Sequence, residues 1–255
     1  MFIFDSNRFN IKSFLKAVAL ITRIPVPDKT FEGDQSNLPI DWAYPLIGLL
    51  LALPIYLAGL LLLSLRFDSG LVAATTVVFL IMSTGAMHED GLADTVDGFW
   101  GGWDKENRLK IMKDSHVGTY GIIALIFSIL IRWYCIKLSI DQNLFFVAIV
   151  TSCTLSRSFM TFYMWTTPCA KEVGLSANTG RPDDVSTTIA FLIGLITTIL
   201  LLGIKSVVVL ALCFVVLWSA KTISTKKING QTGDTIGAVQ QICEVCILCA
   251  ITVLW

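Results

Sequence analysis

Charge is scarce in this sequence. Of its 255 residues only 15% are charged and 55% are hydrophobic, and the mean hydropathy is +0.73. A soluble domain carries about 25% charged residues, and a disordered chain has few hydrophobic ones. The formal net charge is zero, with 19 cations and 19 anions, so the basic excess of a nucleic-acid binder is also missing. The composition excludes these three classes and predicts a membrane protein with several spans.

Long stretches without charge account for most of the chain. Seven segments of at least 15 residues are apolar apart from Arg157 and Glu244, and a spanning helix needs about 20 such residues. They cover residues 43–65, 70–87, 117–131, 143–170, 185–204, 206–220 and 235–255. Arg132 follows the third segment, from where we expect its side chain to reach the membrane surface. With no repeat, low-complexity tract or second domain, we predict one all-α domain over residues 1–255, a polytopic bundle of about seven transmembrane helices.

The first residues lack the long apolar core of a signal peptide, because Arg23 interrupts the short apolar run 17–21. Apolar residues at helical spacing, with lysines beside them, predict an amphipathic helix that lies in the membrane interface or packs on the bundle. These residues are Ile11, Phe14, Leu15, Val18 and Ile21. Pro25 and Pro27 are expected to end this helix.

Lysine and arginine are nearly absent from one set of predicted loops. With seven spans, alternate loops face opposite sides of the membrane. The loops 1–42, 88–118, 167–184 and 221–234, here called the cation-rich loops, hold 14 of the 19 cations, whereas the other loops hold three. The positive-inside rule therefore predicts that these loops and the N-terminus lie in the cytoplasm and the C-terminus lies outside.

The seven cysteines lack the pattern of a disulfide framework, because six lie in apolar runs. Cys243 and Cys246 have the spacing of redox or metal pairs. Inside a membrane helix, we interpret them as small packing residues.

Four carboxylates lie within nine residues in the segment 88–98, at the end of the second predicted span. On a helix, Asp90, Asp94 and Asp97 share one face, whereas Glu89 points about 100° away. Three like charges on one face repel each other and are costly beside lipid, so we expect a compensating cation. Carboxylate oxygens suit Mg²⁺ or Mn²⁺, which proteins often share with substrate phosphates. An acidic, solvated loop end is the alternative interpretation.

Two other cation-rich loops carry groups that complement these carboxylates. The stretch 110–119 mixes cations, a carboxylate and hydroxyls, and the stretch 229–235 is a glycine-rich turn before the seventh span, whose backbone N–H groups favour a phosphate. Asp234 either caps this last helix or faces the acidic cluster through a metal. The candidate substrate-binding residues in these loops are Lys113, Asp114, Ser115, Gly230, Gln231, Thr232 and Gly233.

Two charges fall inside predicted spans, where ionisable groups are functional candidates. Arg157 is a candidate phosphate contact, or the structural partner of Glu244, which is itself a candidate for substrate binding. An ion-coupled transporter that uses this pair is one alternative function, although its carboxylates should lie at the midplane rather than at the boundary. His88 and His116 are candidate ligands or packing residues, and His88 is also a candidate for substrate binding.

Three motifs in one order resemble the cobalamin synthase family, the adenosylcobinamide-GDP ribazoletransferases. They are residues 88–98, 112–119 and 230–238. The resemblance extends from about residue 19 to 250, with shorter matches at 21–27, 45–48, 156–157 and 170–175. Glu89 stands where the family commonly has an apolar residue, which argues against a metal role, and His116 stands where an arginine is common.

This resemblance implies a membrane enzyme that joins α-ribazole, or its 5′-phosphate, to adenosylcobinamide-GDP. The ribazole hydroxyl attacks the phosphoryl group linked to cobinamide, GMP leaves and a phosphodiester forms, with Mg²⁺ as the expected metal. Phosphoryl transfer depends mostly on positioning and charge neutralisation, which agrees with the residue pattern. The resemblance assigns metal and pyrophosphate binding to Asp90, Asp94 and Asp97, and Asp234 joins them as a catalytic candidate.

A lipid synthase similar to the CDP-alcohol phosphatidyltransferases is the second enzyme interpretation, because it also uses an Asp-Gly helix motif at a membrane face. Its Ala-Arg pair is missing, since Ala93 is followed by Asp94. The expected partners are small-molecule substrates and membrane lipid, without nucleic acid; a homo-oligomer is compatible with the sequence.

Overall fold

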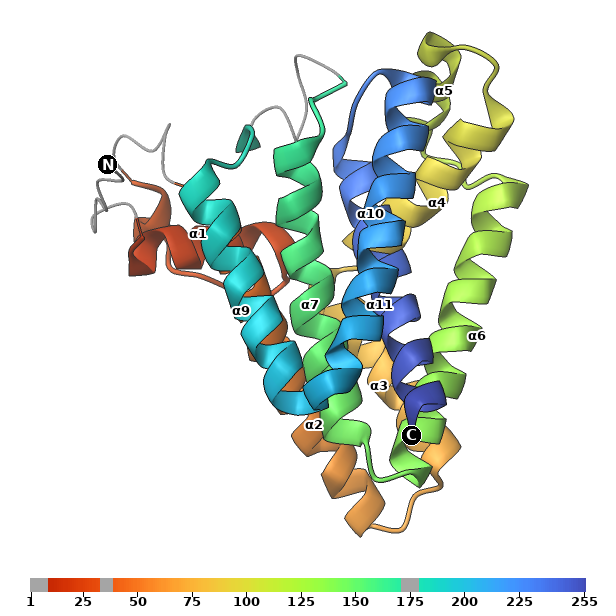
Figure 1. Cartoon of the computed structure of the whole chain (residues 1–255). Coiled ribbons are helices and arrows are strands. Elements are labelled where there is room, and N and C mark those ends of the chain that lie inside the picture. Colours follow the sequence, from red (N-terminus) through yellow and green to blue (C-terminus); the bar gives the residue numbers. More distant parts are fainter. Residues whose placement is uncertain (1–8, 33–38, 171–178) are drawn as a thin grey trace.

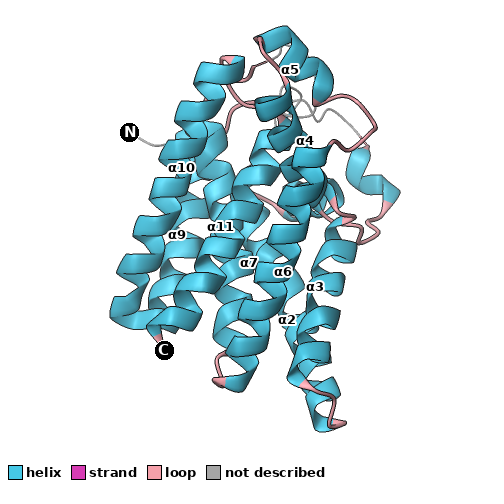
Figure 2. Cartoon of the chain, turned by 90° about the vertical axis from the view of Figure 1, so that its right-hand side faces the viewer, coloured by secondary structure: helices cyan, strands magenta, loops and turns pink. Residues whose placement is uncertain are grey.

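The computed structural model of the chain describes residues 9–32, 39–170 and 179–255. No strand occurs within these ranges, and the predicted all-α class is confirmed (Figure 2). The α-helices are α1 (Ile11–Ile21), α2 (Tyr44–Ser64), α3 (Ser69–Thr84), α4 (Met87–Gly101), α5 (Lys105–Ile111), α6 (Thr119–Asp141), α7 (Phe145–Thr166), α9 (Asp184–Leu202), α10 (Ser206–Ile228) and α11 (Gly233–Leu254). The stretch 171–175, which carries part of the family resemblance, lies outside the described residues.

Each of the seven predicted spans corresponds to a helix, but fewer segments meet the length of a membrane crossing. By length and composition, five described segments do so: Asp41–Ser64, Thr119–Asp141, Phe145–Thr166, Asp184–Ile228 and Gly233–Leu254. The fourth of these contains both α9 and α10, which turn back on each other at Gly203–Lys205 (Figure 1). Helix α3 has only 16 residues and passes the test only together with α4, as a sixth candidate.

A sharp bend separates α3 from α4. Gly85 ends α3 with a φ of 64°, Ala86 follows with a φ of 60°, and the two helices are bent by 87°. A left-handed residue at a helix C-terminus stops the helix and redirects the chain. As a result α4 leaves the line of α3 and packs against α6 and α11.

The loops alternate between the two ends of the bundle. Figure 1 shows the α4–α5 region, the start of α6, the end of α7 and the α10–α11 turn at the upper end. The α2–α3, α6–α7 and α9–α10 connections lie at the lower end with the C-terminus. The described parts of three cation-rich loops therefore share one end, the end that carries α4 and α5.

Helix α7 lies in the centre of the bundle, where it packs against α2, α9 and α11. Its run Ser152–Ser158 is buried on all sides and consists largely of serine, threonine and cysteine. Small side chains allow neighbouring membrane helices to approach closely. Helix α1 packs on the bundle with Ala17, Val18 and Ile21 buried, and its position in the membrane interface stays a prediction.

Candidate active site

The acidic motif is helical, as its spacing predicted. Asp90, Asp94 and Asp97 lie on α4, and their exposure falls along the helix: Asp90 is exposed, Asp94 is half-buried and Asp97 is buried. Beyond the bend, α4 runs from the middle of the bundle towards α5 at the cation-rich end (Figure 1). The three carboxylates therefore form one face along α4, with exposure that decreases from Asp90 to Asp97.

Two glycines let the start of α11 meet this face. A Cβ atom on Gly91 would lie 2.7 Å from the backbone oxygen of Asp234, and one on Gly237 would lie 3.2 Å from the Cα of His88. The two backbones therefore touch at both places, and His88 is buried in this contact. The contact brings Asp234 next to the α4 carboxylates, although the two segments are far apart in the sequence.

The four aspartates act on one another electrostatically. Asp94 lies on α4, outside the five segments that meet the length of a membrane crossing. Its partial burial, together with the negative charges of Asp90, Asp234 and Asp97, raises the pKa of Asp94 to about 7. In the described part of the chain, no ion pair joins Asp90 or Asp94 to a cationic side chain. This cluster therefore favours an added positive charge.

Asp97 has a second function at the start of α6. Its Oδ2 atom accepts a hydrogen bond from the Gly118 N–H at 2.7 Å, and its Oδ1 atom accepts one from the Gly121 N–H at 2.9 Å. A carboxylate suits these positions because the first N–H groups of a helix lack partners within the helix. Asp97 thus ties the acidic helix to the third predicted span, and its role as a metal ligand stays a prediction.

The donor set fits a magnesium ion that shares its coordination with a substrate. Among residues 9–32, 39–170 and 179–255, no three His, Cys, Asp or Glu side chains are close enough to hold a metal by themselves. Mg²⁺ is often held by only one or two carboxylates together with substrate phosphates. The uncompensated oxygens of Asp90 and Asp94, with Asp234 beside them, match that mode of binding.

The glycine-rich turn opens α11 as predicted, but Thr232 is the N-cap residue rather than Asp234. The Thr232 hydroxyl accepts a hydrogen bond from the Thr235 N–H at 3.4 Å and donates to Asp234 Oδ2 at 3.1 Å. Asp234 itself lies in the first turn of the helix, because the cap forms two residues earlier. The Gln231 N–H donates to the Pro168 carbonyl at 2.8 Å, which fastens the turn to the end of α7. The same segment contains the predicted residues Gly230 and Gly233.

Three predicted residues of the loop after α5 stay apart from the carboxylates. Lys113, Asp114 and Ser115 are exposed, and no described contact joins them to α4. Instead Asp114 Oδ1 accepts a hydrogen bond from the His116 N–H at 3.0 Å and lies 2.8 Å from His116 Nδ1. These hydrogen bonds lower the pKa of Asp114 below its ordinary value.

A buried ion network corrects two expectations. Arg132 does not reach the membrane surface: it is 1% exposed, with Nη2 2.9 Å from Glu89 Oε1 and Nη1 3.2 Å from Glu244 Oε1. The predicted pairing of Arg157 with Glu244 is wrong, because Arg157 donates to the Cys153 carbonyl at 2.9 Å. Two carboxylates on neighbouring helices compensate the Arg132 charge, so removing one partner would leave a buried charge without compensation.

Amide side chains extend this network, and sequence reasoning missed them. Gln241 Nε2 donates to Glu89 Oε1 at 3.1 Å, and Gln240 Nε2 donates to Glu244 Oε2 at 2.6 Å. The Ser128 hydroxyl donates to Gln241 Oε1 at 3.2 Å. The available signal was a pair of adjacent glutamines within an apolar span, one helical turn before Glu244.

Comparisons with known proteins agree with the motifs. A family model described as Cobalamin-5-phosphate synthase matches residues 13–252. The chain is 40% identical over 247 residues to an adenosylcobinamide-GDP ribazoletransferase of Sinorhizobium medicae (strain WSM419), a match that covers 92% of this chain and 94% of the relative. A protein of the same name from Rhizobium etli (strain CIAT 652) is 38% identical, with the same shares covered. No solved structure matches the chain. The resemblance drawn from the three motifs is thereby confirmed.

Proposed function

The chain belongs to the cobalamin-5-phosphate synthase family, and we propose that it transfers α-ribazole, or its 5′-phosphate, to adenosylcobinamide-GDP. The oxygen of the ribazole hydroxyl forms a bond to the phosphorus linked to cobinamide and loses its proton. The bond from that phosphorus to the GMP oxygen breaks, and GMP leaves. The product is a phosphodiester between cobinamide and ribazole.

The observation that carries this proposal is the convergence of four aspartates from α4 and α11. A pyrophosphate and a carboxylate cluster are both negative, so they bind each other only with a cation between them. We assign this role to Mg²⁺, with Mn²⁺ as a substitute, held by Asp90 and Asp94 with Asp234 beside them. The ion, when bound, neutralises charge on the substrate phosphates.

The protein's own groups position the substrate. The start of α11 lies beside the carboxylates, and the N-terminus of a helix favours a phosphate. Asp97 holds the first turn of α6 and so keeps the acidic helix in place. Phosphoryl transfer depends mainly on positioning. The start of α11 and the Asp97 hydrogen bonds are therefore expected to contribute to the rate of transfer.

We further propose that the cation-rich end faces the cytoplasm of a bacterial inner membrane, with the C-terminus outside. The support is the distribution of cations, 14 in these loops against three in the others. The carboxylate cluster lies at the same end, where soluble substrates can reach it from the cytoplasm. A reporter fused after residue 105 should give a cytoplasmic signal, and a periplasmic signal there would overturn this orientation.

The decisive experiment is turnover in purified membranes. Adenosylcobinamide-GDP and α-ribazole are supplied with Mg²⁺, or with a chelator in its place, and released GMP is measured. We expect GMP release only when both the acceptor and the metal are present. No GMP release with all components present would reject the function, and equal release with chelator would reject the metal role.

A further inference from the structure

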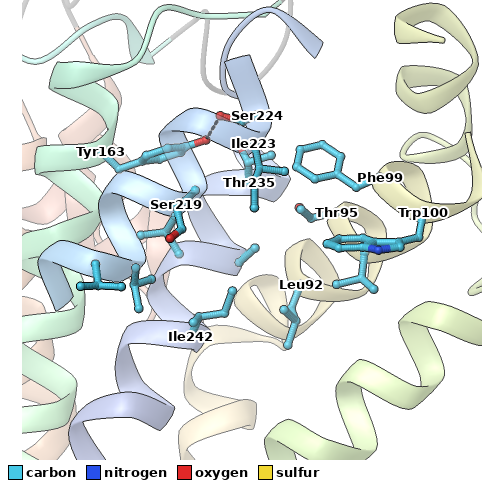
Figure 3. Close-up of a pocket in the computed structure, with 16 residues that line it drawn as sticks. Leu92, Thr95, Phe99, Trp100, Tyr163, Ser219, Ile223, Ser224, Thr235 and Ile242 are labelled. Carbon is cyan, nitrogen blue, oxygen red and sulfur yellow. Dashed lines mark hydrogen bonds between the residues drawn. The ribbon is translucent and has the colours of Figure 1, made fainter. Parts of the chain in front are cut away.

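An apolar cavity of about 330 Å³ lies between α4, α10 and α11, with Tyr163 of α7 at one end (Figure 3). Aliphatic and aromatic side chains make up nearly all of its wall, among them Leu92, Phe99, Trp100 and Ile242. The volume is within the range of small-molecule pockets. Its walls suit a ligand that is mostly apolar and partly aromatic.

One buried hydroxyl in this wall lacks a hydrogen-bond partner within the protein. Thr95 lines the cavity and is 8% exposed, and its hydroxyl has no hydrogen-bond partner in the described part of the chain. A buried hydroxyl without a partner is unfavourable, so a ligand that accepts a hydrogen bond from it is favoured. Other hydroxyls of the wall have partners within the protein: Tyr163 donates to Ser224 Oγ at 2.9 Å (Figure 3), and the Thr235 hydroxyl donates to the Thr232 carbonyl at 3.0 Å.

The cavity adjoins the carboxylate site through the same two helices. Leu92, Thr95 and Phe99 form a stripe of α4 that the helical period places away from the carboxylate face. Thr95 directly follows Asp94, and Thr235, which also lines the cavity, directly follows Asp234. The cavity and the acidic cluster therefore lie on opposite sides of α4, and a molecule with its apolar part in the cavity has to pass around the start of α11 at Thr235 to reach the cluster.

We propose that this cavity binds the aromatic base of the ribazole substrate, an assignment that rests on the proposed function. This base is a flat, methylated benzimidazole with one free ring nitrogen, which can accept the hydrogen bond of the Thr95 hydroxyl. The polar ribose then extends past Thr235 towards Asp234, where its hydroxyl meets the phosphoryl group.

The chemistry of the wall discriminates against the other candidate occupants. Guanine and the corrin ring system carry many amide and amino groups, which an apolar wall would leave without hydrogen bonds. A lipid acyl chain matches the wall but leaves the Thr95 hydroxyl without an acceptor. The ribazole base satisfies both features.

The first test fills the cavity. Ala220 lines it from α10, and Ala211 is exposed on the same helix outside it, so Ala220→Phe and Ala211→Phe form a matched pair. We expect Ala220→Phe to raise the KM for ribazole at least about tenfold and to leave the KM for adenosylcobinamide-GDP within about twofold. Ala211→Phe should change neither. An unchanged ribazole KM in a folded Ala220→Phe protein would overturn the proposal.

The second test removes the hydrogen bond. Thr95→Val keeps the shape of the side chain, and we expect about a tenfold rise in the KM for ribazole. An analogue with a carbon in place of the free ring nitrogen should have the same KM with the wild-type protein and with Thr95→Val. A higher KM for the analogue with Thr95→Val than with the wild-type protein would contradict the assigned hydrogen bond.

Equilibrium dialysis of ribazole against the purified protein in nanodiscs separates this proposal from the proposed function. Ribazole binding that Ala220→Phe weakens supports the cavity, even if no GMP is released. GMP release with unaltered ribazole binding in Ala220→Phe supports the function and rejects the cavity. A loss of co-purified phospholipid in Ala220→Phe, with ribazole binding unchanged, would instead identify a lipid chain as the occupant.

Discussion

Helix α4 carries carboxylates in two contrasting environments. Glu89 is 6% exposed, and its Oε1 atom lies 2.9 Å from the Arg132 guanidinium and accepts a hydrogen bond from Gln241. Asp90 and Asp94, one and five residues later, have no ion pair with a cation in the described residues. The helical period separates the two environments, because Glu89 points away from the aspartate face.

The contrast separates a structural charge from a functional one. In the buried network Arg132 lies between Glu89 and Glu244, and the amides of Gln240 and Gln241 donate hydrogen bonds to the two glutamates. In the aspartate cluster like charges accumulate, and partial burial together with their repulsion raises the pKa of Asp94. Removing a charge should therefore destabilise the protein in the first region, whereas in the second it should impair activity and leave stability intact.

The largest expected effect is in the buried network. Arg132→Met leaves Glu89 and Glu244 buried without their cation, which costs about 3–5 kcal/mol of unfolding free energy. We expect little folded protein in detergent, measured by size-exclusion chromatography and thermal melting. Arg66→Met, at an exposed turn, is the control and should behave as wild type. A normal melting temperature for Arg132→Met would show that the network is not structural.

The next effect concerns turnover alone. Asp94→Asn keeps the size of the side chain but removes one ligand charge, and we expect the GMP release rate to fall about 10²–10³-fold. The melting temperature should stay unchanged or rise, because repulsion within the cluster is relieved. Glu106→Gln, an exposed acid on α5, controls for loss of charge at this end. Full activity in Asp94→Asn would remove the metal hypothesis.

Asp97 lies between the two regions, because it is an aspartate of the acidic face that also satisfies backbone N–H groups. Asp97→Asn retains one acceptor oxygen, so we expect a cost of about 1 kcal/mol in stability and faster hydrogen exchange in the first turn of α6. Asp104→Asn, at the N-cap of the short helix α5, should affect exchange only there. Unaltered exchange at Gly118 and Gly121 would contradict the capping role.

Local patterns predicted the helices and the acidic face, because both depend on residues close in sequence. The apolar runs correspond to α2, α6, α7 and α11, and the i, i+4, i+7 spacing placed Asp90, Asp94 and Asp97 together. The bend at Gly85 and Ala86 had no comparable signal, since its angle depends on the helices against which α4 packs.

Pairings between distant helices could not be predicted. The burial of Arg132 depends on Glu89 and Glu244, which come from two other helices, so its position near the end of an apolar run was misleading. The role of Asp234 stayed open because the contacts at Gly91 and Gly237 that bring it to α4 join segments far apart in the sequence. The cavity is defined by the space between three helices and leaves no local pattern.

The division between the two acidic environments is tested most directly by a Mg²⁺ titration of GMP release with wild type, Asp90→Asn and Glu89→Gln. The two substitutions are at adjacent positions and each removes one negative charge. We predict that Asp90→Asn raises the half-saturating Mg²⁺ concentration at least about tenfold, whereas Glu89→Gln leaves it within about twofold for equal amounts of folded protein. Equal shifts in both variants, or no shift in Asp90→Asn, would contradict the account.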